Sequence, residues 1–278
     1  MSELKVALIQ LRTPATQAAA LAQAEPLIRQ AAAQGAELIL TPEGSNLLQR
    51  DRALLAPLLR TVEEDACVQG LVALAVALKV WLLIGSALVL SEDGVAVNRA
   101  LLVDPDGRIT ATYDKMHMFD VDLPNGERAR ESEAYRPGER AVVADTPWAR
   151  LGLTICYDMR FAYLYRALAK AGAQIIAAPA AFTRPTGAAH WEILLRARAI
   201  ETGSFILAPA QGGRHEDGRG TWGRSIIVAP WGEVLAVSPD DEPGVVSATL
   251  DLDAVRRARE AIPALKNERA FTGPDAAP

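Results

Sequence analysis

Short apolar runs alternate with longer stretches of helical periodicity along most of the chain. Apolar runs bounded by turn residues are typical of buried strands, and apolar residues that recur once per helical turn are typical of amphipathic helices. The runs predict strands at 4–10, 36–43, 80–90, 150–156, 173–180, 204–210 and 245–250. The periodic stretches predict helices at 16–34, 53–78, 161–171, 189–202 and 251–262. This alternation favours parallel strands covered by helices.

Two segments predict hairpins, and one predicts a long loop. The segment 99–115 has turn chemistry around Gly107, and the segment 224–238 turns at Gly232. Polar residues with interspersed Pro and Gly predict a loop at 116–140. The hairpins add antiparallel strands, so the pattern alone fits either a three-layer Rossmann-like fold or a two-sheet α/β sandwich.

Residues 70–90 form an apolar stretch that is long enough to resemble a membrane span. Lys79 lies near its middle, where a lysine would cost about 2.5–3.5 kcal/mol in a bilayer. The stretch is therefore predicted to be two buried elements, a helix that ends near Lys79 and a strand that follows it.

Composition and charge exclude several classes of protein. The chain has 278 residues, half of them hydrophobic and 23% charged, which is typical of a globular protein with a sizeable core. No linker or repeat divides it, so a single domain over 1–278 is expected. The net charge of −5 gives no reason to expect binding to nucleic acid or to an anionic membrane.

The cysteines and the N-terminal residues indicate the cellular compartment of the protein. Only Cys67 and Cys156 occur, which is too few for a disulfide framework and suits a reducing cytosol. The first residues predict a strand and lack the layout of a signal peptide. A cytoplasmic location is predicted on these grounds.

Ionisable side chains follow three of the predicted strands. Glu43, Lys115 and Cys156 each stand just beyond an apolar run, where α/β folds present their chemistry. A thiol is mostly protonated near neutral pH and needs a base or a positive field to react. Glu43 could be that base if burial raises its pKa, and Lys115 could stabilise the thiolate and a later oxyanion.

Each of these residues also has a purely structural interpretation. A lone buried cysteine is usually a small core residue. Glu43 could cap a helix, and Lys115 could be a solvated surface charge. Cys67 has no comparable neighbours in the sequence and is interpreted as structural.

The histidines give little support for other chemistry. His117, His190 and His215 match no metal-ligand spacing, so no metal site is predicted. A Cys–His protease would need His117 or His190 as its base, and it would leave Glu43 and Lys115 without a role.

At these residues the sequence resembles the nitrilase superfamily of carbon–nitrogen hydrolases, whose signature is a Glu–Lys–Cys triad in that order. The segments that carry the resemblance are "LILTPEGSN" with Glu43, "YDKMHMFDVDLP" with Lys115 and "GLTICYDMRF" with Cys156. It continues through "AHWEILLRARAIET", "PAQGGRHE", "IIVAPWGEVLA" and "AIPALKNERAF". The resemblance implies a four-layer α-β-β-α sandwich of two mixed sheets and a reaction that needs no metal or organic cofactor.

The resemblance also implies further site residues. A second glutamate of the family matches Glu131, which would orient Lys115, with Glu133 as the fallback. The backbone N–H of Tyr157 would help to hold the oxyanion. Phe182 and Thr183 would lie at the substrate pocket. Arg160 and Arg214 are also expected to contact substrate, because a substrate carboxylate needs a cation.

Arg160 has a competing interpretation. It could anchor a substrate carboxylate, or it could form a salt bridge with Asp158 or a dimer contact. Arg214 belongs to the segment 211–220, which could accommodate a larger leaving group or be a surface turn that contacts nothing.

Within the superfamily the chain is most similar to the branch of deaminated glutathione amidases and omega-amidases. This implies hydrolysis of an amide of a small carboxylic or 2-oxo acid through a cysteine thioester, with deaminated glutathione as the first choice. The alternatives are an omega-amidase, a nitrilase, an N-carbamoyl-amino-acid hydrolase, or a catalytically silent scaffold of the same fold. Arg224 stands where a histidine is common and Ala162 where a proline is expected.

The family relationship finally implies a homodimer or a higher homo-oligomer. The helix after Arg160 and the region 189–202 would form the contact between subunits. The tail from about residue 263 would reach toward the partner.

Overall fold

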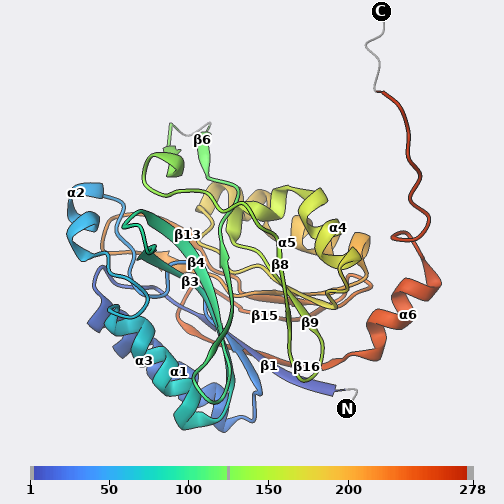
Figure 1. Cartoon of the computed structure of the whole chain (residues 1–278), viewed down its shortest axis with the longest axis horizontal. Helices are drawn as coiled ribbons and strands as arrows, with labels where there is room; N and C mark the ends of the chain where they lie inside the picture. The colour runs from blue at the N-terminus through green and yellow to red at the C-terminus, as the bar shows by residue number, and fades with distance from the viewer. Residues whose placement is uncertain (1–2, 124–125, 274–278) are drawn as a thin grey trace, which may run out of the picture.

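The computed structural model describes residues 3–123 and 126–273, which form two six-stranded mixed sheets (Figure 1). In order across the first sheet, the strands are β16 (Gly244–Asp251), β1 (Glu3–Gln10), β2 (Leu38–Leu40), β3 (Trp81–Leu90), β4 (Ala96–Val103) and β5 (Ile109–Asp114). In order across the second, they are β15 (Val234–Val237), β14 (Ile226–Val228), β11 (Phe205–Ala208), β10 (Ile175–Ala177), β9 (Arg150–Leu153) and β8 (Val142–Asp145).

Helices cover the outer faces of both sheets. In Figure 1, α1 and α3 lie on one side of the strands, and α4 and α5 lie on the other. The helices are α1 (Gln17–Ala33), α2 (Arg52–Leu55), α3 (Ala66–Leu78), α4 (Ala162–Lys170), α5 (Arg184–Thr202) and α6 (Asp253–Ala261). Short 3-10 helices cover Ala56–Leu58, Glu131–Glu133 and Cys156–Arg160. Two small ribbons complete the fold, β6 (Asp120–Asp122) with β7 (Arg128–Arg130) and β12 (Gly212–Arg214) with β13 (Gly220–Trp222).

Strand β1 shows why the strands are apolar along their whole length. Successive side chains of a strand point to opposite faces. Leu4 and Leu8 belong to the core that joins the two sheets, whereas Ala7 and Ile9 belong to the core under α1 and α3. Both faces are covered, as expected for the inner layers of a sandwich. The predicted four-layer α-β-β-α fold is confirmed, and the three-layer alternative is excluded.

The apolar stretch 70–90 is two elements, as predicted. Helix α3 ends at Leu78, Lys79 takes a left-handed conformation with φ of 57°, and β3 follows. Within the described part of the chain, no helix is both long enough and apolar enough to span a membrane.

The prediction of one continuous helix over 53–78 is wrong. The chain forms α2 and a 3-10 turn, runs irregularly from 59 to 65, and enters α3 where the Asp65 carboxylate accepts the N–H of Val68. Pro57 has no N–H to continue a helix. Leu55 and Leu59 meanwhile pack in a small separate core.

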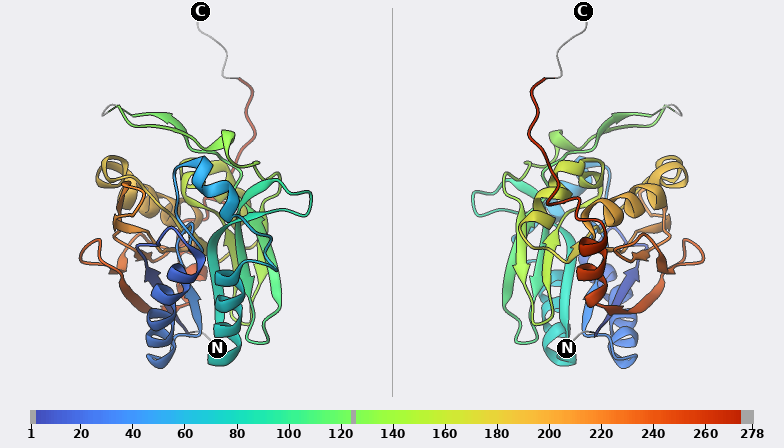
Figure 2. Two further views of the ribbon diagram at one scale, coloured as in Figure 1. Left: turned by 90° about the vertical axis from the view of Figure 1, so that its left-hand side faces the viewer. Right: turned by 90° about the vertical axis from the view of Figure 1, so that its right-hand side faces the viewer.

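Two segments depart from the body of the sandwich. The predicted loop 116–140 contains the β6–β7 ribbon, which projects from the body in both views of Figure 2. Beyond Glu268, which pairs with Arg166 and Lys170 of α4, the chain also leaves the body, and Phe271 in it is 85% exposed (Figures 1 and 2). The last five residues of the predicted domain, 274–278, lie outside the described residues.

Candidate active site

The structure brings together the three residues that follow β2, β5 and β9. Lys115 Nζ donates a hydrogen bond to Glu43 Oε1 at 2.9 Å. The thiol of Cys156 lies beside the same carboxylate and interacts with it. Two strands of one sheet and one strand of the other therefore place an ammonium, a carboxylate and a thiol at one point.

A second carboxylate completes the surroundings of the ammonium. Lys115 Nζ donates to both oxygens of Glu131, at 2.9 and 2.7 Å, and the Phe119 N–H holds Glu131 Oε2 at 2.7 Å. The fallback residue Glu133 instead pairs with Arg52 at 2.7 Å. The structure thus places Glu131, and not Glu133, against Lys115.

Asn98 connects the two carboxylates and was not identified from the sequence. Its Nδ2 donates to Glu43 Oε1 at 2.9 Å and to Glu131 Oε1 at 3.3 Å. Asn98 lies on β4, and the side chain is buried. An amide within a largely apolar strand was the signal that could have identified it, because buried polar groups need partners.

Burial and charge set the protonation of the three groups. Lys115 is 2% exposed, and Glu43 and Cys156 are each 7% exposed. Burial acts to raise the pKa of Glu43, but the Lys115 charge and hydrogen bonds from Cys156, Lys115 and Asn98 outweigh it, so that the pKa lies below its ordinary value. Burial therefore does not raise the pKa of Glu43 above its ordinary value, which was the condition set for its role as the base.

The other two groups shift in the opposite direction. Burial, together with the Glu43 charge, raises the pKa of the Cys156 thiol well above its ordinary value. Burial acts to lower the pKa of Lys115, yet the charges of Glu131 and Glu43 raise it well above its ordinary value. The resting site therefore holds a neutral thiol, a carboxylate and an ammonium, so that Glu43 is in the form that can accept a proton.

Cys156 stands at a tight turn. Its φ of 51° is unusual for a residue with a Cβ and costs roughly 1–3 kcal/mol. Its N–H is bound to the carbonyl of Pro179 at 2.8 Å.

A buried aspartate holds this turn against the strand that carries Lys115. Asp158 accepts hydrogen bonds from the N–H of Ile155 at 2.8 Å, from Tyr113 Oη at 2.6 Å and from the N–H of His117 at 3.1 Å. Tyr113 belongs to β5, two residues before Lys115. Asp158 thus fixes the thiol relative to the ammonium.

No histidine among the described residues lines the cavity around Cys156. The ring of His117 contacts Asp158 and Tyr163 and stacks on Phe161, and the ring of His190 contacts Arg160. Nor do the described residues contain a cluster of three His, Cys, Asp or Glu side chains that could hold a metal ion. The Cys–His interpretation thus lacks its base.

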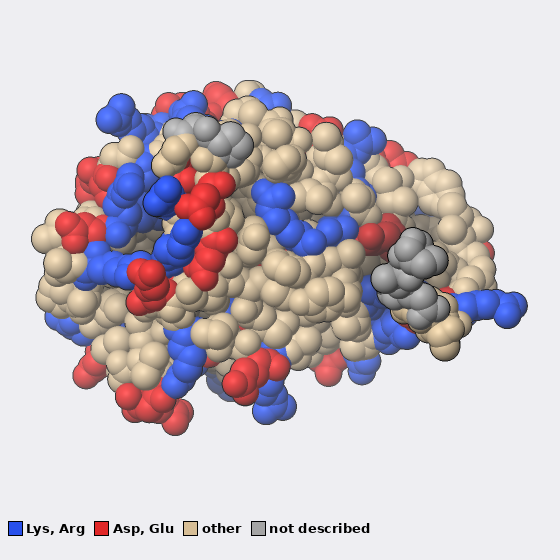
Figure 3. All heavy atoms as spheres, turned by 90° about the horizontal axis from the view of Figure 1, so that it is seen from above, with Lys and Arg blue, Asp and Glu red and all other residues tan. Residues whose placement is uncertain are grey.

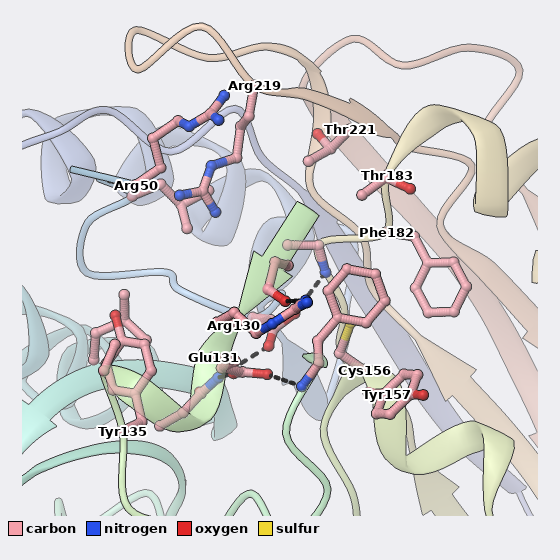
Figure 4. Close-up of a pocket in the computed structure, with 18 of the residues that line it drawn as sticks. Arg50, Arg130, Glu131, Tyr135, Cys156, Tyr157, Phe182, Thr183, Arg219 and Thr221 are labelled. Carbon is pink, nitrogen blue, oxygen red and sulfur yellow. Dashed lines mark hydrogen bonds between the residues drawn. The ribbon is translucent and has the colours of Figure 1, made fainter. Parts of the chain in front are cut away.

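The three groups form the floor of a cavity of about 310 Å³ (Figures 3 and 4). Aromatic side chains and threonines line its walls: Phe119, Tyr157, Phe182, Thr183, Thr186 and Thr221. Tyr135 and several arginines lie toward its mouth: Arg50, Arg52, Arg128, Arg130 and Arg219. Figure 3 shows basic and acidic side chains gathered around a hollow on this face.

The residues predicted to contact substrate separate into two groups. Phe182 and Thr183 line the cavity. Arg160 and Arg214 are absent from the described lining, and Arg214 is exposed on β12. The neighbouring Arg219, from the same predicted segment, does reach the cavity.

Arg160 lies behind the aromatic wall. Its guanidinium carbon is 5.7 Å from the ring centre of Tyr157 and 5.6 Å from that of Phe182. No ion pair joins it to Asp158 in the described chain, so the alternative of a salt bridge between them is wrong. Arg224 is likewise outside the described lining, and its φ is 61°.

Comparison with known proteins identifies the family to which the chain belongs. The carbon-nitrogen hydrolase family profile matches residues 5–260. The deaminated glutathione amidase of Yersinia enterocolitica is 41% identical over 280 residues, which cover 97% of this chain and 94% of that protein. The human omega-amidase NIT2 is 34% identical over 269 residues, which cover 97% of this chain and 96% of that protein.

A solved structure agrees with these relatives. The NitFhit protein of Caenorhabditis elegans superposes with a TM-score of 0.89 at 33% identity, covering 97% of this chain and 66% of that longer chain. The chain belongs to the carbon–nitrogen hydrolase family of the nitrilase superfamily. It is a hydrolase of carbon–nitrogen bonds with an amidase activity, and the predicted branch is confirmed. The scaffold alternative is thereby excluded.

Proposed function

We propose that the chain hydrolyses an amide of a short dicarboxylic or 2-oxo acid, with deaminated glutathione as the first choice of substrate and 2-oxoglutaramate as the second. The observation that carries the chemistry is the contact of Lys115 with Glu43 and Glu131 beside the Cys156 thiol. The choice of substrate rests on the similarity to deaminated glutathione amidases and omega-amidases.

The first half of the proposed reaction forms a thioester. Glu43 takes the proton of the Cys156 thiol as the sulfur attacks the amide carbonyl carbon. The carbonyl oxygen becomes an oxyanion, which Lys115 and the N–H of Tyr157 stabilise. Glu43 then gives its proton to the amide nitrogen, the carbon–nitrogen bond breaks, and the amine leaves.

The second half releases the acid. Glu43 takes a proton from a water molecule, which attacks the thioester carbon. The carbon–sulfur bond breaks, the carboxylic acid departs, and the proton on Glu43 returns to sulfur. Glu131 is assigned a positioning role, because both of its oxygens accept hydrogen bonds from Lys115.

The size and lining of the cavity fit this substrate class. Its volume of about 310 Å³ is at the lower end of the range of roughly 300–1,000 Å³ that holds drug-sized ligands. The cavity can therefore accept an acyl chain together with a leaving group larger than ammonia. Phe182 and Thr183 are proposed to contact the substrate within it.

A direct comparison of substrates tests the proposal. Catalytic efficiency is measured on deaminated glutathione and on 2-oxoglutaramate, with release of Cys-Gly and of ammonia scored separately and a simple aliphatic nitrile as the control. We expect the highest efficiency on deaminated glutathione. Preference for the nitrile, or turnover of neither amide, would overturn the substrate assignment and leave the cysteine chemistry to be tested separately.

A homodimer in the cytosol is part of the same proposal. Helices α4 and α5 expose the apolar side chains of Tyr163, Ile193 and Ile200, which are 65%, 70% and 56% exposed. Such exposed apolar groups are typical of an interaction surface. Light scattering should give the mass of a dimer or a larger oligomer, and a Tyr163→Glu, Ile193→Glu variant should be smaller. A monomeric wild type would contradict the proposal.

A further inference from the structure

The lining of the cavity is richer in basic side chains than the chain as a whole. Six of its described lining residues are arginine or lysine and three are glutamate, whereas the whole chain has a net charge of −5. A cleft lined by one sign of charge attracts ligands of the opposite sign. An anionic substrate would therefore bind those basic side chains of the lining that carboxylates of the protein leave unpaired.

Most of the arginines at the mouth are already paired. Arg52 contacts Glu133 at 2.7 Å, and Arg128 and Arg130 share Asp122 at 3.2 and 2.7 Å. The lining carboxylate Glu127 is also engaged in an interaction. These arginines stabilise the mouth itself.

Arg50 and Arg219 differ from the other arginines. Arg50 is exposed and has no ion pair within residues 3–123 and 126–273. Arg219 contacts the fully buried carboxylate of Asp217 through Nε alone, at 2.7 Å. Neither terminal nitrogen of the Arg219 guanidinium has a hydrogen bond in the described chain. In Figure 4 both side chains lie on one side of the cavity, across from Phe182 and Tyr157.

Asp217 orients Arg219 in advance. The Asp217 side chain also accepts the N–H of Arg219 at 3.0 Å, so that backbone and side chain are held together in the turn between β12 and β13. A guanidinium that is fixed by one edge offers its other edge as a planar pair of donors. Such a pair matches a carboxylate.

We propose that Arg50 and Arg219 bind the terminal carboxylate of the leaving group of the substrate. This inference rests on the proposed function and names the part of the substrate that the mouth recognises. Cys156 and Lys115 are buried, whereas Arg50 is exposed and Arg219 is 28% exposed. The acyl group must stay on Cys156 while the amine departs toward solvent, so the leaving group lies on the side of the mouth.

The pair would distinguish two kinds of amide. A dipeptide leaving group ends in a carboxylate, whereas the ammonia released from a primary amide carries none. We therefore expect the Arg50→Ala, Arg219→Ala double variant to lose at least about tenfold in kcat/KM on deaminated glutathione, mainly through KM. Its kcat/KM on 2-oxoglutaramate should stay within about twofold of the wild type.

Arg140→Ala is the matched control. Arg140 is also an exposed arginine without an ion pair in the described chain, but it is absent from the cavity lining. Its loss removes one exposed positive charge and should change kcat/KM on neither substrate. Equal losses of kcat/KM on both amides would show that the two arginines bind the acyl group, and this would overturn the proposal. No loss of kcat/KM on either amide would overturn it as well.

Binding to an inactive variant separates this proposal from the proposed function. Calorimetry compares deaminated glutathione with its C-terminal carboxamide on Cys156→Ala, with and without the two arginine substitutions. We expect the carboxylate to bind at least about tenfold more tightly, and the preference to disappear without the arginines. Absence of the preference would overturn the proposal. If the carboxylate is preferred and the preference depends on the arginines, but the active enzyme hydrolyses neither amide, only the proposed function would be overturned.

Discussion

At the floor of the cavity the charged groups hold one another, whereas at its mouth Arg50 has no ion pair in the described chain. The Lys115 ammonium contacts two carboxylates, and Asn98 joins those carboxylates to each other. Arg219 is held at one edge only, by Asp217. The floor is buried, and the mouth is partly open to solvent.

This difference separates the reaction from the choice of substrate. A buried network that is complete before substrate arrives needs little rearrangement when charge develops in the transition state. N–H donors without partners at the mouth instead form their hydrogen bonds with the ligand. We therefore expect substitutions at the floor to act on kcat for every substrate, and substitutions at the mouth to act on KM for particular substrates.

The largest effect is expected at the thiol. Cys156→Ala should abolish essentially all hydrolysis and leave the fold intact, because no other group can form the thioester. Steady-state turnover and circular dichroism check this. Cys67→Ala is the control, since Cys67 is fully buried in the other core and its burial raises the pKa of its thiol to about 12. More than a few per cent of activity in Cys156→Ala would show that the nucleophile lies elsewhere.

The next largest effect concerns the partners of the thiol. Glu43→Gln and Lys115→Met should each lower kcat by at least about 10²-fold, which is the usual scale for an acid–base group or an oxyanion donor. Both amides should be affected equally, unlike the loss expected at the mouth. Mass spectrometry of the substrate-treated wild type should detect an acyl adduct on Cys156. Normal turnover in either variant would remove that residue from the mechanism.

Much of the floor could be predicted from the sequence, and little of the mouth. Glu43, Lys115 and Cys156 follow apolar runs, so that the pattern of strands already indicates where each stands. Arg50 and Arg219 are surface-type residues in irregular segments. The contact between Asp217 and Arg219 is local to one turn, and it is the long-range pairing of Thr221 with Thr183 that brings this turn to the cavity.

The pKa of Glu43 shows a second limit of sequence reasoning. Burial could be anticipated from the apolar surroundings, but it acts against the hydrogen bonds and the charge that Lys115 and Asn98 supply. The sign of the shift depends on which influence is larger. That comparison requires the positions of partners that are far away in the sequence.

The stability of the fold is expected to depend on pH. Burial lowers the pKa of His215 to about 4, and the ring contacts Thr13 and Thr221. Between about pH 6.5 and pH 4 the unfolded chain binds a proton at His215 that the folded chain excludes, so stability falls as the pH falls. The loss at pH 4 should reach about 3 kcal/mol.

Urea unfolding at several pH values measures this effect. His215→Gln should unfold with a weaker dependence on pH than the wild type over this range, because glutamine binds no proton there. Thr221 lines the cavity, so KM for deaminated glutathione should also rise in the wild type as the pH falls. Identical pH dependence in the two proteins would show that His215 titrates normally in the fold.

The smallest effect expected is that of salt, and it compares floor and mouth within the unaltered enzyme. Raising the salt concentration from roughly 0.05 M to 0.5 M shortens the range of electrostatic attraction severalfold and screens exposed charges far more than buried ones. Arg50 is exposed, whereas Lys115 is 2% exposed. KM for deaminated glutathione should therefore rise a few-fold while kcat stays constant, and KM for 2-oxoglutaramate should rise less. A fall in kcat with unchanged KM would place the salt-sensitive charges at the floor and contradict the division between the two regions.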